Sequence, residues 1–192
     1  MASNEYHFIT YWRMRASAQE VIDILSDVEN LPRWWPSVYL KVTQIEPGDK
    51  DGIGKKVDLY TKGWLPYTLR WEFSITESNT PRSFALQAKG DFVGRGIWTF
   101  QQDGEWVNIA YDWKIRAEKP LLKSFSFVLK PIFSMNHHWA MAKGEESLRL
   151  ELLRKRAVSL NQRSLIPDPP VPTPTHPLRW VWYVIRHRQN KI

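Results

Sequence analysis

Two adjacent histidines in the stretch "SMNHHWAMAKG" are the residues best suited to chemistry, because histidine titrates near neutral pH. Neighbours on a helix point about 100° apart, so His137 and His138 cannot hold one ion together, and no metal site is expected. His137 could act as a general base near its ordinary pKa, hydrogen-bond a ligand, or serve as a structural histidine. The structural role is favoured.

Arg95, in "GRGIWTF", is the second candidate for a catalytic role. If its side chain points inward, it is the best anchor in the chain for an anion or a carbonyl group. If it points outward, it is a solvated charge. Trp98 and Phe100 share one face of this segment with two glycines, which leaves Arg95 on the other face. The outward orientation is favoured.

Motifs that would define a known active site are missing from the sequence. The chain has no cysteine, which excludes disulfides, thiol nucleophiles and thiolate metal sites. It also lacks a glycine-rich phosphate loop, a Gly-x-Ser-x-Gly elbow and a His-Glu-x-x-His pattern. No cofactor is expected, and any catalytic assignment stays open.

Tryptophan is unusually frequent, with 11 residues beside 8 Phe and 7 Tyr. Its large apolar body favours either a bulky core or an aromatic cavity wall. The segment "NLPRWWPSV" places Trp34 and Trp35 between Pro32 and Pro36, which keep the turn short and rigid. We expect one of the two rings to pack inward and the other to lie on a rim.

The charge of +7 is unevenly distributed, since residues 158–192 hold five basic residues and one acid. The remaining body is only mildly basic, which disfavours a nucleic-acid partner. The first residues lack a basic start followed by a long apolar run. The run "WVWYVI" is far too short to span a bilayer. A cytoplasmic location is expected.

Hydrophobic periodicity predicts the elements that would position these side chains. Strands are expected near 6–14, 38–46, 54–61, 67–77, 83–89, 92–102 and 105–117. Two of them alternate clearly, with Trp71 and Trp113 on the apolar faces. For both tryptophans, core packing and cavity lining are equally favoured. One wet face indicates an antiparallel sheet that is covered on one side.

Two short helices and one long helix complete the predicted elements. Ser17 and Glu20 form a capping box that starts the first helix, and Asn30 is expected to cap a second short turn. Residues 119–157 form the long helix, which Pro131 should kink or split. This order predicts an α+β fold, in which a curved antiparallel sheet of about seven strands wraps round a long C-terminal helix.

The segments 17–38 and 136–148, with weaker support from 94–100, resemble the START-like (SRPBCC) helix-grip superfamily, in particular its polyketide cyclase/dehydrase-type branch. The resemblance spans roughly residues 6–157. It implies a deep, mostly apolar cavity between the sheet and the long helix. Members of the superfamily bind lipids, polyketides, isoprenoids and other hydrophobic molecules, and some are aromatase/cyclases.

The resemblance implies that the chain binds a hydrophobic small molecule in this cavity. One alternative is a polyketide cyclase, aromatase or dehydratase-type enzyme, in which His137 or Arg95 assists enolate chemistry. A second alternative is a lipid or quinone carrier that weakly contacts membranes through residues 119–133 or the tail. The expected ligand-binding residues are Trp34, Trp35, Tyr60, Trp71, Trp98, Phe100, Trp113, Phe133, Asn136, His137 and Ala140.

Three regions are expected along the chain. Residues 1–160 form the ligand-binding domain, and residues 161–177 form an extended linker because "IPDPPVPTPTHP" holds six of the 13 prolines. Residues 178–192 form an aromatic and basic C-terminal segment. Such an apolar segment should dock on its own domain, pair with a second copy in a homodimer, or lie on a membrane surface. Docking on protein is favoured.

Overall fold

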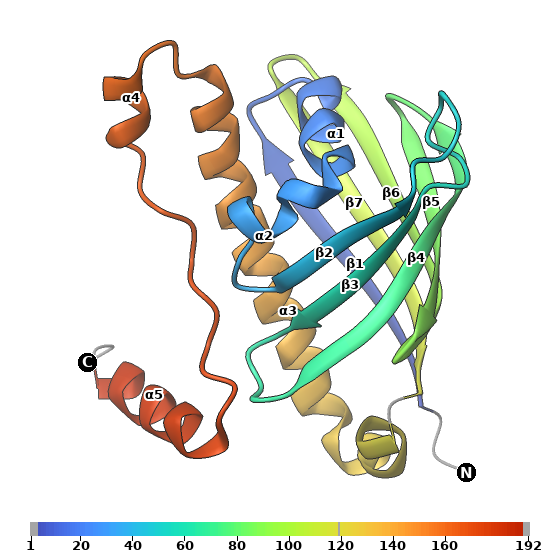
Figure 1. The fold of residues 1–192 in the computed structure, drawn as a ribbon, viewed down its shortest axis with the longest axis vertical. Helices are drawn as coiled ribbons and strands as arrows, with labels where there is room; N and C mark the ends of the chain where they lie inside the picture. Colours follow the sequence, from blue (N-terminus) through green and yellow to red (C-terminus); the bar gives the residue numbers. More distant parts are fainter. Residues whose placement is uncertain (1–3, 119, 190–192) are drawn as a thin grey trace.

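A single antiparallel sheet organises the chain (Figure 1). The computed structural model describes residues 4–118 and 120–189, and within 120–129 and 187–189 it describes the backbone alone. The seven strands are β1 (Glu5–Met14), β2 (Tyr39–Glu46), β3 (Lys56–Lys62), β4 (Thr68–Asn79), β5 (Ser83–Gly90), β6 (Phe92–Asp103) and β7 (Trp106–Ala117). Their order is β1-β7-β6-β5-β4-β3-β2, and every neighbouring pair is antiparallel. All seven expected strands are confirmed.

The inner face of the sheet carries the core. In β7 the alternate residues Ile109, Tyr111 and Trp113 are buried, as the period of two predicts. Asp103 and Gly104 lie at the turn between β6 and β7, where the φ of +57° at Gly104 suits a residue without a Cβ.

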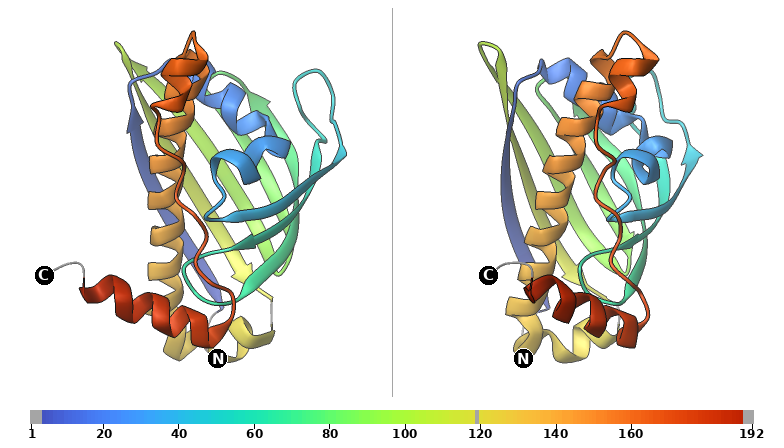
Figure 2. Two further views of the ribbon diagram at one scale, coloured as in Figure 1. Left: turned by 60° about the vertical axis from the view of Figure 1, so that its left-hand side comes forward. Right: turned by 90° about the vertical axis from the view of Figure 1, so that its left-hand side faces the viewer.

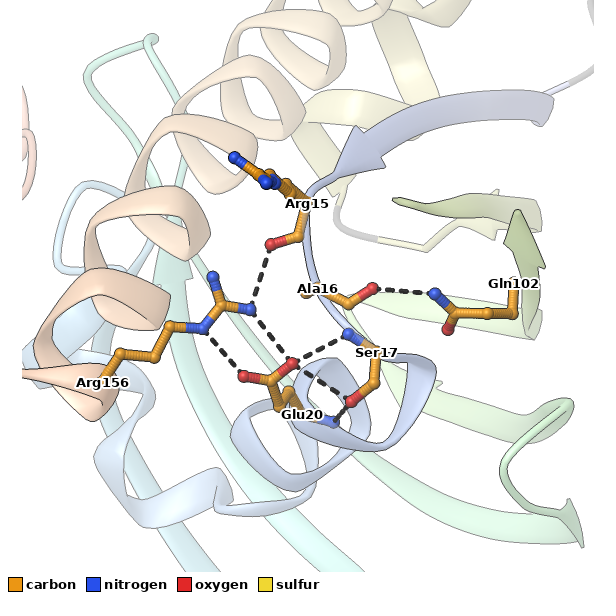
Figure 3. A network of polar contacts seen from close by, with 6 residues as sticks. All are labelled: Arg15, Ala16, Ser17, Glu20, Gln102 and Arg156. Carbon is orange, nitrogen blue, oxygen red and sulfur yellow. Dashed lines mark hydrogen bonds and ion pairs between the residues drawn. The ribbon is translucent and has the colours of Figure 1, made fainter. Parts of the chain in front are cut away.

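The capping box forms as expected at the start of α1 (Ala18–Ser26). The Ser17 hydroxyl accepts a hydrogen bond from the Glu20 backbone N–H, and the Glu20 carboxylate accepts one from the Ser17 N–H. Arg156, at the far end of the chain's longest helix, donates to the same carboxylate and to the Arg15 carbonyl (Figure 3). The Arg156 side chain lowers the pKa of Glu20 to about 2. One carboxylate therefore joins α1 to the end of that helix.

The Trp-Pro segment forms a 3-10 turn, η1 (Val28–Asn30), followed by α2 (Leu31–Trp34). Asn30 does not cap α2 through its side chain, so that expectation is wrong. Its amide group instead donates to Asp27 and accepts from Arg33. Trp34 and Trp35 are 1% and 3% exposed, so neither ring lies on a rim, and the expectation of one rim tryptophan is also wrong.

The long helix α3 (Pro120–Arg156) closes the open side of the curved sheet, beside α1 and α2 (Figure 1). It contains Pro131 and is not split, but its first turns run at a clear angle to the rest (Figure 2). Met141, Leu148 and Leu152 are buried in the core. Together these features confirm the α+β helix-grip architecture.

After α3 the chain turns back along the molecule (Figure 2). A short helix, α4 (Leu160–Ser164), precedes the proline-rich stretch, and α5 (Pro177–Gln189) lies at the end of the molecule where α3 begins (Figure 2). Thr173, in the proline-rich stretch, is 3% exposed and contacts Lys62 at the end of β3. The tail thus docks on its own domain. Among the described residues, no helix combines the length and the apolar character that crossing a bilayer requires.

Candidate functional site

A cavity of about 130 Å³ lies between the inner face of the sheet and α3. Much of its wall is aromatic, and the rings come from the sheet, from α3, from the segment before β2 and from the loop between β3 and β4: Tyr6, Phe8, Trp35, Tyr39, Tyr67, Trp71, Phe92, Tyr111, Trp113 and Phe133. Polar groups are few, and include Thr61, Lys62, Asn136 and His137. An apolar pocket with a few convergent polar groups is typical of a small-molecule site.

Small residues on α3 make room on the helix side of this cavity. Ala140 lines the wall directly. One turn further along α3, Gly144 faces the indole of Trp35, and a Cβ at this position would overlap that ring. The absent side chain at Gly144 therefore allows the Trp35 ring to approach α3 closely while it lines the cavity.

His137 lies on the cavity wall, and its ring stacks on Phe8 with centroids 4.1 Å apart. Burial, and secondarily the neighbouring His138, lower the pKa of His137 to about 4. The expectation of a base near its ordinary pKa is therefore wrong, because burial disfavours the charged imidazolium. His138 points elsewhere, is exposed, and its Nδ1 lies 2.7 Å from the Ser134 carbonyl oxygen.

Three polar atoms on the wall find no hydrogen-bond partner among the described residues. They are the Tyr6 hydroxyl, Trp35 Nε1 and His137 Nε2, and each is buried. Buried polar groups are normally paired, because leaving one unpaired costs roughly 1–3 kcal/mol. The three atoms have almost no exposed surface, even towards the cavity, so a molecule inside it would pair with them only after a shift of the Tyr6, Trp35 or His137 side chain.

Asn136 plays a structural part at the edge of the cavity. Its Oδ1 accepts a hydrogen bond of 2.9 Å from the Leu65 backbone N–H. Gly63 provides the space for this amide, since a Cβ there would overlap it. Asn136 thus fixes the loop between β3 and β4 against α3.

The structure places seven of the expected site residues on the cavity wall: Trp35, Trp71, Trp113, Phe133, Asn136, His137 and Ala140. Four other aromatic candidates lie off the wall. Trp34 is buried beneath Trp35, with ring centroids 5.6 Å apart. Trp98 and Phe100 are buried in the core, where Trp98 stacks on Tyr111 at 4.1 Å. Tyr60 lies under the Arg70 guanidinium on the other face of the sheet.

Arg95 does not reach the cavity. Its guanidinium pairs with Glu77 at 2.7 Å, and both side chains are largely exposed. The favoured outward orientation agrees with this geometry, and the catalytic role suggested for Arg95 is excluded by it.

Lys62 and Tyr6 are site residues that the sequence reasoning missed. Lys62 is 2% exposed, and its Nζ donates to the carbonyl and hydroxyl oxygens of Thr173. Burial lowers its pKa to about 8. A lone lysine at a strand end gives no signal of burial. Tyr6 could have been found, because the even-numbered residues of β1 form its inner face.

Comparison with known proteins agrees with this geometry. The sequence pattern of the family described as polyketide cyclase / dehydrase and lipid transport matches residues 13–142. The chain belongs to this family, within the START-like superfamily of helix-grip proteins. No curated protein matches the sequence closely enough to count as a relative.

Several solved structures share the fold at low sequence identity. The protein TTHA0849 from Thermus thermophilus superposes with a TM-score of 0.63 at 15% identity, over 80% of this chain and 99% of that protein. The ZhuI aromatase/cyclase from Streptomyces sp. R1128 gives a TM-score of 0.62 at 16% identity, over 80% and 97%. A START superfamily protein from Mycobacterium smegmatis gives 0.56 at 14% identity, over 76% and 96%. These likenesses establish the fold.

Proposed function

We propose that the protein binds a mostly apolar small molecule that carries one or two hydrogen-bonding groups, such as a hydroxyl or a carbonyl. The observation that carries this proposal is a mostly apolar cavity whose wall includes three residues with a buried, unpartnered polar atom. Apolar burial, at ~25 cal/mol per Å², would supply most of the affinity. Tyr6, Trp35 and His137 would orient the guest.

Aromatase or cyclase-type catalysis is the second candidate. The Tyr6 hydroxyl could serve as a general acid and His137 Nε2 as a general base. Both residues line the cavity, and both atoms lack partners among the described residues. The ZhuI aromatase/cyclase has the same fold. General-base catalysis is most effective when the pKa lies near the working pH, and the pKa of His137 is lowered to about 4. Binding is therefore the better supported function.

Carriage of a lipid or quinone is a form of the binding proposal. The matching family is described as including lipid transport. The wall offers apolar surface and few charges, which suits a carrier, and at about 130 Å³ the cavity has room for a short part of a hydrocarbon or isoprenoid chain.

Filling the cavity tests the binding proposal. The probe is 1-naphthol, an apolar molecule with one hydroxyl, titrated by the quenching of its fluorescence. Ala140→Phe should weaken binding at least ~10-fold, because the added ring occupies the space beside Ala140. Ala142→Phe is the matched control, since Ala142 is exposed on the same helix. Equal binding by wild type and Ala140→Phe would overturn the proposal.

Naphthalene tests the polar part of the proposal. Wild type should bind 1-naphthol roughly 3- to 10-fold more tightly than naphthalene, which corresponds to one hydrogen bond. Tyr6→Phe and His137→Phe remove two of the unpartnered atoms. If neither variant reduces the difference in affinity between 1-naphthol and naphthalene, the polar part of the proposal is wrong and the cavity binds by apolar contact alone.

A further inference from the structure

The C-terminal helix α5 is fixed to the domain through one face. The ring of Trp180 packs edge-on against Trp64 with centroids 5.0 Å apart, and its Nε1 donates to the Trp64 carbonyl oxygen at 2.7 Å. Just before the helix, Thr173 receives hydrogen bonds from Lys62 and donates to the Trp64 carbonyl at 3.0 Å. These contacts hold α5 in a defined orientation beside the loop between β3 and β4.

The outward face of α5 is an apolar stripe. Leu178, Val181, Trp182 and Ile185 are spaced at i, i+3, i+4 and i+7, which places them on one side of a helix. They are 70%, 45%, 73% and 48% exposed. A helix normally buries such a stripe, and no described part of the domain covers this one. We call these four residues the α5 stripe.

Positive charge accompanies the α5 stripe. Residues 177–192 contain no Asp or Glu, and Arg179 and Arg186 are exposed on the helix. An interfacial helix has a tryptophan and aliphatic residues on one face and arginines beside them. At ~1.5 Å per residue, the 13 residues of α5 span roughly 20 Å, which suits a helix lying in a bilayer surface.

Charge argues against a second copy as the occupant. If two α5 stripes faced each other, the arginines of one helix would approach those of the other, and the whole chain carries +7. An anionic lipid surface instead complements this charge and accommodates an interfacial tryptophan. The family match ends at residue 142, so α5 lies outside the part that identifies the family.

From this geometry we propose that the α5 stripe docks the protein on the surface of an anionic lipid bilayer, with Arg179 and Arg186 at the level of the lipid phosphates. The helix borders the loop that carries Gly63, a residue of the cavity wall, so docking would bring that wall towards the membrane. This proposal does not depend on what the cavity binds.

Vesicle co-sedimentation of the full chain tests the proposal. The vesicles contain phosphatidylcholine with about a third phosphatidylserine, compared with phosphatidylcholine alone. Wild type should bind the anionic vesicles, more weakly as salt rises. Trp182→Ser combined with Ile185→Ser should lower this binding at least ~10-fold. Arg179→Gln combined with Arg186→Gln should reduce the preference for anionic vesicles.

Leu160→Ser combined with Leu165→Ser is the matched control, because both leucines are exposed in the tail outside α5. This variant should bind as wild type does. The proposal is overturned if wild type does not bind anionic vesicles, or if the Trp182/Ile185 variant binds equally well. It is also overturned if sedimentation velocity shows a wild-type dimer that the Trp182/Ile185 variant dissociates, since the α5 stripe would then be a homodimer interface.

Discussion

At the scale of single residues, the cavity depends on two positions of α3 that carry little or no side chain. Gly144 and Ala140 are one turn apart on α3. The missing Cβ of Gly144 leaves space for the Trp35 ring, and the small side chain of Ala140 leaves space for the cavity. Alanine is ordinary inside a helix, whereas glycine costs roughly 1 kcal/mol there. The two small residues matter for the packing between α3 and the opposite wall of the cavity, because that wall is built from large aromatic rings.

Gly144→Ala tests this arrangement. In an exposed helix interior the change should stabilise by roughly 1 kcal/mol, since alanine is the better helix former. Here the new Cβ would overlap the Trp35 ring, and we expect a net loss of about 1–3 kcal/mol in the free energy of unfolding. Urea unfolding measures it. Ala142→Gly, at an exposed site on α3, is the comparison and should cost about 1 kcal/mol. A stabilised Gly144→Ala variant would contradict the account.

His137 should make stability depend on pH. Its pKa is lowered from 6.5 to about 4 in the folded protein, so between these values the unfolded chain binds the extra proton. Stability is therefore lost as pH falls from 6.5 towards 4, at up to about 1.4 kcal/mol per pH unit.

Urea unfolding at pH 7 and pH 5 should show this loss in wild type, and His137→Gln should remove about 2 kcal/mol of the difference. His138→Gln is the control, because that side chain is exposed; it should keep most of the pH dependence and lose only the smaller part that His138 adds by lowering the pKa of His137. The same pH dependence in wild type and His137→Gln would show that the imidazole is not held neutral by burial.

At the scale of elements, the end of β3 joins the domain to its tail. Lys62 donates to Thr173, 111 residues further along the chain, and is buried by that contact. The ammonium group has oxygen acceptors there rather than a carboxylate, which fits a role in fastening the tail.

Lys62→Met should loosen the tail. Hydrogen bonds to a charged group contribute roughly 1.5–3 kcal/mol, so trypsin should cleave after Arg179 at least ~10-fold faster when they are lost. Limited proteolysis followed by mass spectrometry gives the rate. Lys41→Met, at an exposed position on β2, should leave the rate unchanged. An unchanged rate in Lys62→Met would mean that Lys62 does not hold the tail and that its other contacts, such as those of Thr173 and Trp180 with Trp64, are sufficient.

Local patterns were sufficient to predict most elements but not how they meet. The seven strands and the capping box at Ser17 follow from alternation and short-range hydrogen bonding, which a sequence displays directly. The buried contact between Lys62 and Thr173 joins distant segments, so no local pattern marks it. α4 was also not foreseen.

The sequence also did not show which inward-facing residues line the cavity and which are packed in the core. Trp98 and Trp113 both belong to inward-facing patterns, yet only Trp113 lines the cavity. Alternation shows which face of a strand a residue lies on. Whether the space beside that residue is filled depends on the neighbouring rings, and the space beside Trp98 is filled by Tyr111, which stacks on it with centroids 4.1 Å apart. Of the eleven residues expected to bind a ligand, seven line the cavity and four do not, and ligand binding by the seven stays a prediction.

At the scale of the whole molecule, the apolar cavity lies under α3, and the interior around Trp12 and Trp98 is packed with aromatic rings. The rings of Trp12 and Trp98 have centroids 5.4 Å apart. The cavity lies near the loop between β3 and β4, where the tail docks and α5 presents its apolar stripe. We expect a guest to enter and leave near this loop.

The most direct test is native mass spectrometry of the protein purified from its own host. The account predicts that wild type carries a small apolar molecule with a hydroxyl or carbonyl group, released on denaturation. Ala140→Phe should lack it and Ala142→Phe should retain it. If folded wild type carries no guest and takes up none from a total lipid extract of the host, or if Ala140→Phe carries the same guest in the same amount, the central claim is contradicted.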